Sequence, residues 1–286
     1  MVAYYQNADF VKDLNHQQEM LFRSLFYLGP LRTKTARIYS WNGIAPDSVG
    51  YSGESAVAAL LAARDRKIGI KRGEMKRASP SKPLAEIVAR NLLEMGLVND
   101  FKLVPLGEHR HEYEVQVQVA GGGGWVDLPD TGFGISQVLP VLVQCYYAPP
   151  GSVIIMEQPE IHLHPSAQSA LADVLIDVVQ SRENNRDRDI QLIIETHSEH
   201  FLRRIQRRIA ENVIGQEVVS AYFSTFADTS SRLVPLELDA YGSIRNWPEN
   251  FFGDEMGDIL HQSKAAMERG SGRSGDRRAV SLSGVC

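Results

Sequence analysis

An apolar strand, a loop and an amphipathic helix follow one another twice in the second half of this sequence. Residues 153–156 are apolar, and residues 165–180 carry apolar side chains at helical spacing after an initial proline. Residues 190–196 are apolar on both faces, and Ser198 precedes a second amphipathic stretch. A strand, a crossover helix and a further strand make a parallel β-α-β unit. The sequence therefore predicts an α/β fold built on a parallel sheet.

Two titratable side chains come directly after these strands, Glu157 after the first and His197 after the second. Ligands of open parallel sheets bind at the carboxyl ends of the strands. A carboxylate at that edge is a candidate Mg²⁺ ligand beside phosphate oxygens. Glu160 or Gln158 could orient or deprotonate a water, and His197 could stabilise charge on a terminal phosphate. The simpler alternative has about equal weight: both glutamates lie on an exposed loop and His197 caps a helix.

The other segments predict a small helical region and two antiparallel hairpins. Residues 52–66 and 81–96 have helical periodicity, the second with a start at Ser81. Residues 113–119 alternate between apolar and polar side chains and precede a glycine-rich turn and a returning strand. Residues 217–238 read as a second hairpin. The expected domain ranges are an N-terminal connector (1–53), a helical subdomain (54–100), a β-hairpin region (101–129), an ATPase lobe (130–226), a C-terminal hairpin and helix (227–268) and a disordered tail (269–286).

Three motifs in a fixed order give the chain a resemblance to a class of ATPases. The segment VIIMEQPEIHLHP (153–165) resembles the Walker B segment of ABC-class ATPase heads, the AAA-family branch that contains SMC, RecF and OLD-type ATPases. The segment LIIETHSEHF (192–201) is similar to their strand and switch histidine, and DTGFGISQVLPVLVQ (130–144) to their signature segment. The flanks FYLGPLR, NGIAPDSVGYSGESAV and LELDAYGSIRNWPENFF resemble a bacterial subfamily with a C-terminal domain of unknown function. The resemblance covers most of residues 25–255.

This resemblance implies ATP and Mg²⁺ as cofactors and gives a role to each matching residue. Glu157 takes the Mg²⁺ position, and His197 takes the switch position. Gln158 replaces the usual catalytic glutamate, and an amide cannot accept a proton from water. Either Glu160 supplies the base, or hydrolysis is slow and the head acts mainly as an ATP-gated clamp. The signature residues implied to meet ATP of an opposite subunit are Gly132, Gly134, Ser136 and Gln137.

The sequence lacks a phosphate-cradling loop. Such a loop needs G-x-x-x-x-G-K-S/T, and no Gly-Lys dipeptide occurs in the chain. The glycines at 121–124 precede Trp125 and not a lysine, which favours a hairpin turn. The resemblance puts the P-loop before any segment seen here. We therefore expect the C-terminal part of a partial P-loop NTPase, with an exposed sheet edge that an upstream segment or another chain completes.

Composition limits the partners and the compartment. The formal net charge of −5 argues against a protein that coats nucleic acid. Two basic segments are candidates for local DNA contact: residues 64–77, expected to be an exposed loop, and 203–208, where a solvated helix face is the preferred reading. Cys145 and Cys286 form no disulfide framework, and no signal or membrane segment is evident. We expect a cytoplasmic protein without a membrane partner.

Two further histidines, His162 and His164, are spaced as zinc ligands can be. No complementary Cys/His set accompanies them, so a role in structuring the loop is favoured. The leading expectation for the whole chain is an ATP-binding head that forms a homodimer or joins a P-loop-bearing chain, in DNA maintenance or phage defence. The alternatives are a non-catalytic interaction module and an inactive fragment.

Overall fold

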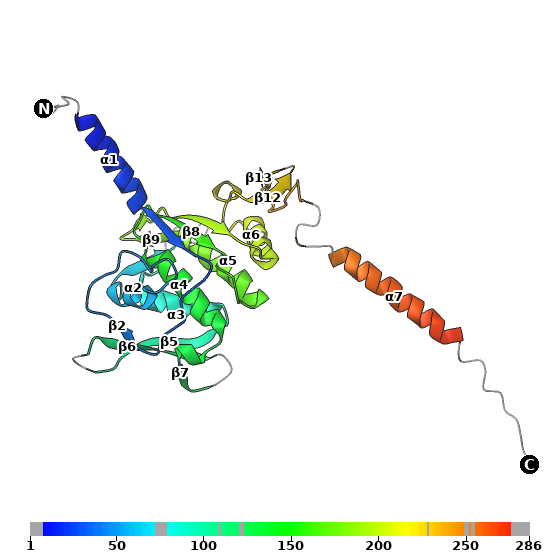
Figure 1. The fold of residues 1–286 in the computed structure, drawn as a ribbon, viewed down its shortest axis with the longest axis horizontal. Coiled ribbons are helices and arrows are strands. Elements are labelled where there is room, and N and C mark those ends of the chain that lie inside the picture. The colour runs from blue at the N-terminus through cyan, green and yellow to red at the C-terminus, as the bar shows by residue number, and fades with distance from the viewer. Residues whose placement is uncertain are drawn as a thin grey trace, which may run out of the picture. The chain divides into compact units, whose positions relative to one another are not determined.

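The computed structural model describes residues 8–71, 79–107, 110–119, 123–227, 229–248, 252 and 255–275. The chain divides into two compact units. The first comprises Met1–Ser220 and Leu238–Ser243, and the second comprises Ala221–Glu237 and Ile244–Cys286. Figure 1 shows the elements of both units.

The first unit contains a three-stranded parallel sheet in the order β1 (Leu25–Leu28), β8 (Val153–Glu157) and β11 (Gln191–Glu195). Both outer strands run parallel to β8, and Glu195 lies opposite Glu157 in the register. Because the three strands share one direction, their carboxyl ends meet at one edge of the sheet. The predicted parallel β-α-β unit is confirmed, and β1 adds a strand that the sequence analysis did not identify.

The two faces of this sheet differ in burial. Phe26, Leu28, Ile154 and Met156 face the hydrophobic core and are buried. On the opposite face Ile193 is 55% exposed, which is unusual because parallel sheets are normally covered on both faces. Among the described residues, β1 and β11 have no strand partner on their outer sides. The expected exposed edge is therefore present.

Three helices surround the strand ends: α4 (Phe133–Tyr147), α5 (Pro165–Val179) and α6 (Glu199–Ala210). Helix α5 begins at its proline as predicted, because a proline at the first helical position lacks only a donor that would be unpaired anyway. Helix α6 begins after Ser198, whose Oγ accepts the Phe201 N–H at 3.0 Å. The histidine-cap alternative is wrong, since Ser198 and not His197 caps this helix.

The helical region consists of α2 (Ala56–Ala62) and α3 (Leu84–Glu94), each with a buried apolar face. The predicted start of the second helix at Ser81 is wrong. Residues Lys82–Pro83 form the short strand β4, and the proline has an extended backbone with φ −54° and ψ 146°. A proline also disfavours helical backbone in the residue before it, so the helix begins only at Leu84.

The segment 64–77, expected to be an exposed loop, contains a buried strand. Strand β3 (Lys67–Ile70) pairs antiparallel with β4 and with β9 (Ser181–Glu183), which in turn pairs with β10 (Arg186–Asp187). The two isoleucines of β3, Ile68 and Ile70, are buried. The free energy gained by burying their apolar side chains stabilises a strand here, although basic residues flank it. Residues 72–78 of this candidate lie outside the described residues.

A separate antiparallel sheet confirms the predicted alternating strand. The sheet contains β5, β6 and β7 together with the short β2, and Val115 and Val117 of β6 are buried. Strands β6 and β7 pair antiparallel, which confirms the predicted returning strand, whereas residues 120–122 of the predicted glycine-rich turn lie outside the described residues. The bounds of these elements are β2 (Tyr39–Ser40), β5 (Val98–Pro105), β6 (Glu112–Val119), β7 (Trp125–Asp127) and η1 (Leu128–Asp130).

Terminal elements differ in part from the expected ranges. Helix α1 (Ala8–Arg23) lies in the expected connector, and η2 (Gln216–Val218) follows α6. In the second unit, β12 (Tyr222–Ala227) and β13 (Ser230–Pro235) form the predicted hairpin. Helix α7 (Glu255–Gly275) continues past its predicted end at residue 268. The rest of the expected disordered tail, 276–286, lies outside the described residues.

Candidate functional site

Four residues lie at the carboxyl ends of β8 and β11: Glu157, Gln158, Glu195 and His197. The Gln158 N–H donates to the Glu195 carbonyl at 2.8 Å, which joins the loop after β8 to the neighbouring strand. The carboxylate oxygen Oε1 of Glu195 lies 2.9 Å from His197 Nε2 and 3.5 Å from Gln158 Nε2. Glu195 therefore links two residues that the sequence predicted. It was missed itself, although it ends the second apolar strand as Glu157 ends the first.

Glu157 is partly buried and bonded to β1. The Tyr27 hydroxyl donates to Glu157 Oε1 at 2.5 Å. This hydrogen bond to a carboxylate, more than any other cause, raises the pKa of Tyr27 well above its usual range. The ring of Tyr51 lies 5.1 Å from that of Tyr27, centroid to centroid. A Cβ atom at Gly29 would lie 2.9 Å from the Tyr51 ring, so only glycine allows this aromatic pair to approach the backbone after β1.

The loop after β8 is held by Arg32, which follows β1 and is 7% exposed. Its Nη1 donates to the carbonyl oxygens of Pro30 and Gln158, both at 3.0 Å, and its Nη2 donates to that of Glu157 at 3.0 Å. Burial lowers the pKa of Arg32, and the charge of Glu160 opposes that shift. Gln158 has a positive φ of 45°, which is uncommon outside glycine.

Glu160 is 6% exposed, so the expectation that it lies on an exposed loop is wrong. Its Oε1 accepts the Thr196 hydroxyl at 2.6 Å and the His197 N–H at 3.0 Å. Its Oε2 is buried and has no hydrogen-bond partner within the part of the chain that the structure describes. The carboxylate thus faces the loop that carries His197, and its role as a base stays a prediction.

The predicted signature residues lie in the first turns of α4. Gly132 precedes the helix with ψ 158°, and no side chain caps the helix start. A Cβ at Gly134 would lie 3.3 Å from the His162 carbonyl oxygen, so the start of α4 approaches the loop after β8 closely. Ser136 and Gln137 are each 8% exposed, and the Ser136 hydroxyl donates to the Phe133 carbonyl at 2.7 Å. The helix start therefore offers backbone N–H groups, whereas these two side chains are turned inward.

His162 and His164 structure the loop between β8 and α5. His164 is the N-cap of α5, and its Nδ1 accepts the Ser166 N–H at 3.3 Å. His162 has a positive φ of 64°, and its ring lies 6.1 Å from that of Phe133 on α4. No group of three potential ligands for a metal ion occurs among the residues described. These contacts agree with the favoured loop-structuring role.

The residues at the strand ends fit Mg²⁺ in one respect. Protein-bound Mg²⁺ is commonly held by one or two carboxylates, with phosphate oxygens and waters filling the other positions. Glu157 offers such a carboxylate at the correct edge of the sheet, with one oxygen already bonded to Tyr27. The fit to phosphate is incomplete, because the sequence has no P-loop. Only a phosphate group bound from elsewhere would complete this site.

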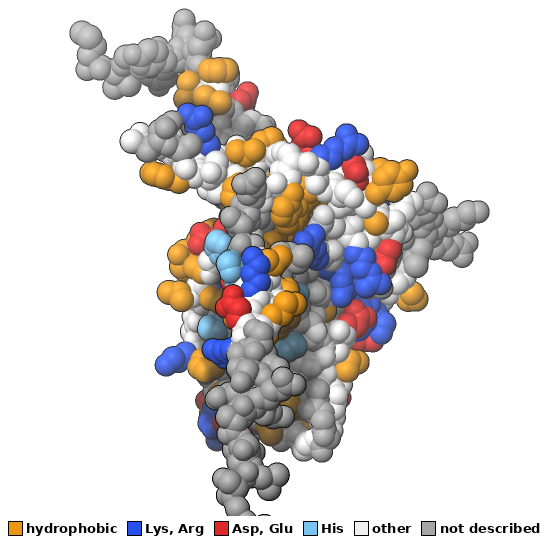
Figure 2. Space-filling model, turned by 90° about the vertical axis from the view of Figure 1, so that its right-hand side faces the viewer, with side chains coloured by type: hydrophobic (Ala, Val, Ile, Leu, Met, Phe, Trp, Pro, Cys, Tyr) orange, Lys and Arg blue, Asp and Glu red, His pale blue; other side chains and the backbone are white. Residues whose placement is uncertain are grey.

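The basic segment 203–208 is paired within the fold. Arg204 and Arg208 of α6 both form ion pairs with Asp173 of α5. The ion pairs of the two remaining arginines are Arg203 with Glu199 and Arg207 with Glu211. On the face shown in Figure 2, basic side chains lie close to acidic ones. This pairing agrees with a solvated helix face and gives no support to a DNA surface there.

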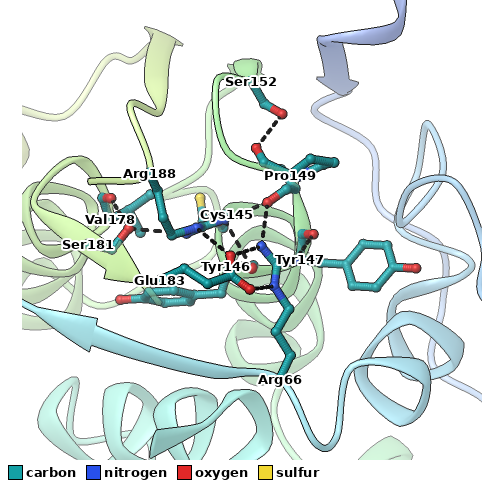
Figure 3. Close-up of polar contacts among 11 residues, drawn as sticks. Arg66, Cys145, Tyr146, Tyr147, Pro149, Ser152, Val178, Ser181, Glu183 and Arg188 are labelled. Atoms are coloured by element: carbon teal, nitrogen blue, oxygen red, sulfur yellow. Dashed lines mark hydrogen bonds and ion pairs between the residues drawn. The ribbon is translucent and has the colours of Figure 1, made fainter. Parts of the chain in front are cut away.

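Two arginines secure the far end of α4 (Figure 3). Arg188 is fully buried, and Arg66 binds Glu183 through Nε and Nη2 at 2.7 and 2.6 Å. Both guanidinium groups donate to the last carbonyl oxygens of the helix, which otherwise have no partner in an α-helix. The carbonyl oxygens that they reach belong to Cys145, Tyr146, Tyr147 and Ala148. Arg66, from the basic segment 64–77, is therefore structural.

Two family profiles match adjacent parts of the chain. Residues 73–203 match the family described as "AAA domain, putative AbiEii toxin, Type IV TA system". This match covers less than half of the chain. The matched region contains the candidate Mg²⁺, base, switch and signature residues, namely Glu157, Gln158, Glu160, His197, Gly132, Gly134, Ser136 and Gln137. Residues 214–262 match the family described as "Protein of unknown function (DUF3696)". No curated protein matches the chain.

Solved structures similar to this chain include heads of SMC ATPases. One comes from work titled for ATP-driven dimerization and DNA-stimulated activation of SMC ATPases, with 13% identity, TM-score 0.41, and 54% of this chain and 84% of that chain covered. A second is the Smc head domain of Pyrococcus furiosus with an extended coiled coil, bound to the C-terminal domain of ScpA. It has 12% identity and a TM-score of 0.40, and the match covers 54% of this chain and 35% of that chain. A third is an Smc head bound to the winged-helix domain of ScpA. It has 12% identity and a TM-score of 0.39, and the match covers 55% of this chain and 43% of that chain. The similarity covers about half of the chain, which spans less than half of the last two structures.

Proposed function

We propose that this chain is the C-terminal part of an ATP-binding, ABC-type head. In this proposal an upstream segment or another chain supplies the P-loop. The observation that carries it is the position of Glu157 opposite Glu195 in the strand register, at the sheet edge where Glu195 contacts both Gln158 and His197. The AAA-domain family of residues 73–203 supports nucleotide binding. None of the described helices is long and apolar enough to cross a bilayer.

Within the proposed site each residue has a distinct task. Glu157 would hold Mg²⁺, whose charge would neutralise phosphate oxygens. His197 would stabilise charge near the terminal phosphate, with its ring oriented by Glu195. The open N–H groups at the start of α4, at Gly132 and Gly134, would meet a phosphate held by an opposite subunit. In that arrangement Ser136 and Gln137 support the helix start from the inside.

The base for hydrolysis is the weakest part of the site. Gln158 cannot accept a proton, and Glu160 is buried with one oxygen bonded to Thr196 and to the His197 N–H. This geometry favours slow hydrolysis and an ATP-gated clamp over a fast ATPase. Assembly as a homodimer around ATP would bring the start of α4 to the opposite site. A role in phage defence or DNA maintenance rests on analogy with the matching family.

The test uses the protein purified from the cell that makes it. Its intact mass is compared with 31.8 kDa, and Mg²⁺-dependent ATP binding and turnover are measured on the same sample. A heavier chain, or a tightly associated P-loop protein, together with ATP binding that Glu157→Ala weakens, would support the head. A species of matching mass without a P-loop partner and without ATP binding would refute it.

A non-catalytic interaction module is the second candidate. The uncovered sheet face around Ile193 and the lack of a P-loop motif favour it specifically. Such a module would bind its partner without nucleotide. The same purification separates the two functions, because only the head binds ATP.

A further inference from the structure

Two buried, oppositely charged side chains join the loops that follow all three parallel strands. Arg32 follows β1, Glu160 follows β8, and the groups that Glu160 binds follow β11. Both side chains are less than a tenth exposed. Neither lies within a helix or strand, so packing of regular elements does not account for their burial.

Arg32 fixes the backbone of the loop after β8. Its guanidinium donates to the carbonyl oxygens of Glu157 and Gln158 at 3.0 Å each, so the peptide groups on both sides of the Gln158 Cα are held in one orientation. This contact stabilises the positive φ of Gln158, a conformation that costs about 1 kcal/mol or more for a residue with a side chain. Gln158 is thereby aimed at Glu195.

Glu160 fixes the loop after β11. Its Oε1 accepts both the Thr196 hydroxyl and the His197 N–H, at 2.6 and 3.0 Å. The side chain of His197 is 78% exposed and contacts only Glu195 among the hydrogen-bond and ion-pair partners found in the described ranges. The position of its ring therefore depends on the backbone that Glu160 holds.

The two charges also depend on each other. Burial lowers the pKa of Arg32, whereas the negative charge of Glu160 favours its protonated form. Arg32 Nε and Glu160 Oε2 are both buried without a hydrogen-bond partner among the described residues. Buried charges with incomplete pairing destabilise a fold in general, and such groups can specify one geometry.

We propose that Arg32 and Glu160 are positioning residues that set Gln158 and His197 in one fixed arrangement. The inference rests on the proposed function for its catalytic meaning, and on the geometry alone for the fixed loops. It assigns Glu160 to loop positioning and not to proton abstraction. It also explains why a residue outside the AAA-domain match, Arg32, contacts the strand ends within it.

Amide hydrogen exchange tests the positioning on the chain itself, without nucleotide. In Arg32→Met the amides of Gln158 and His197 are expected to exchange at least about tenfold faster, while those of Ile154 and Met156 in β8 keep their rates. Arg32→Lys should give exchange rates between those of the unmodified protein and those of Arg32→Met. An ammonium group cannot donate to two carbonyl oxygens in the planar geometry of a guanidinium. The matched control is Arg23→Met, an exposed arginine paired with Glu19.

Two results would overturn the inference. Unchanged exchange rates of the Gln158 and His197 amides in both Arg32 variants would show that the two loops keep their conformation without Arg32. Equal acceleration at these amides and in β8 would show a general loss of stability. If Arg32→Met does not fold, Arg32→Lys alone decides between these outcomes.

Turnover of the native species then separates positioning from base chemistry at Glu160. Glu160→Gln keeps an oxygen that accepts from Thr196 and His197 but removes the negative charge that favours protonated Arg32, so kcat should fall by less than in Glu160→Ala and KM for ATP should not change. Glu160→Ala removes that acceptor and should lower kcat at least about tenfold. An equal, large loss in both variants would make Glu160 the base and overturn its positioning role. Absence of turnover in the unmodified protein would refute the proposed function, and the exchange experiment would still decide the inference.

Discussion

The Nε2 atom of His197 lies 2.9 Å from the Oε1 atom of Glu195, the last residue of β11. A carboxylate beside one ring nitrogen fixes the orientation of an imidazole and the site of its proton. The same carboxylate oxygen lies 3.5 Å from Nε2 of Gln158. Glu195 therefore lies between Gln158 and His197 and contacts both side chains.

His197→Ala is expected to lower ATP turnover of the native species by about 10²-fold, because it removes a preorganised group near the developing charge. Turnover is measured by phosphate release at saturating ATP. His200→Ala is the matched control, since His200 is an exposed histidine of α6 three positions further on. Equal turnover in the two variants would remove His197 from the mechanism.

Gln158→Glu is expected to raise turnover by about tenfold, because the carboxylate can accept the proton that an amide cannot. The new carboxylate would lie beside Glu195, and repulsion between them favours a protonated form of one of the two. Single-turnover hydrolysis measures the chemical step directly. The same change combined with Glu157→Ala serves as the control and should abolish the gain. A slower Gln158→Glu protein would argue that the amide itself is required.

Much of the core was predictable because its signals are local. The strands and helices around Glu157 and His197 follow from apolar periodicity, and parallel strand direction places both residues at one edge. The hydrogen bond that the Ser198 Oγ accepts from the Phe201 N–H was equally readable from the sequence. These interactions join residues that are close in the chain.

The remainder of the site depends on contacts between distant residues. Arg32 meets the carbonyl of Glu157 across 125 positions, and Tyr27 meets its carboxylate across 130. Neither residue carries a local pattern that indicates the contact. Strand β1 was missed for the same reason, since its four residues become a strand only by pairing with β8. Burial of Glu160 likewise depends on the loop after β11.

Arg188→Met is expected to destabilise the first unit by about 3 kcal/mol. The change removes donors to the carbonyl oxygens of Cys145, Tyr146 and Ala148 and leaves those oxygens buried without that partner. Urea unfolding followed by circular dichroism measures the loss. Arg23→Met, in an exposed ion pair, should change stability by less than about 0.5 kcal/mol. Similar values for both variants would show that the hydrogen bonds of Arg188 do not stabilise the end of α4.

Cys145 is expected to make the stability of the fold fall as pH rises above about 9. Its thiol is fully buried in α4, and burial raises its pKa from 9.0 to about 12, against the lowering effect of Arg188. Between these values the unfolded chain releases the thiol proton while the folded chain keeps it, so rising pH favours unfolding. Below pH 9 both states hold the proton and the contribution is fully present.

The measurement compares Cys286→Ser with Cys145→Ala/Cys286→Ser by urea unfolding at pH 8 and pH 10.5. The stability advantage of the thiol should shrink by about 1 to 2 kcal/mol over that interval, because one pKa unit corresponds to about 1.4 kcal/mol. The two proteins share every other titrating group, so their difference isolates Cys145. In the same background iodoacetamide should modify Cys145 only when urea unfolds the chain, since the reactive thiolate is suppressed in the fold. Rapid modification of the folded protein, with a stability difference that is independent of pH, would contradict the buried, neutral thiol.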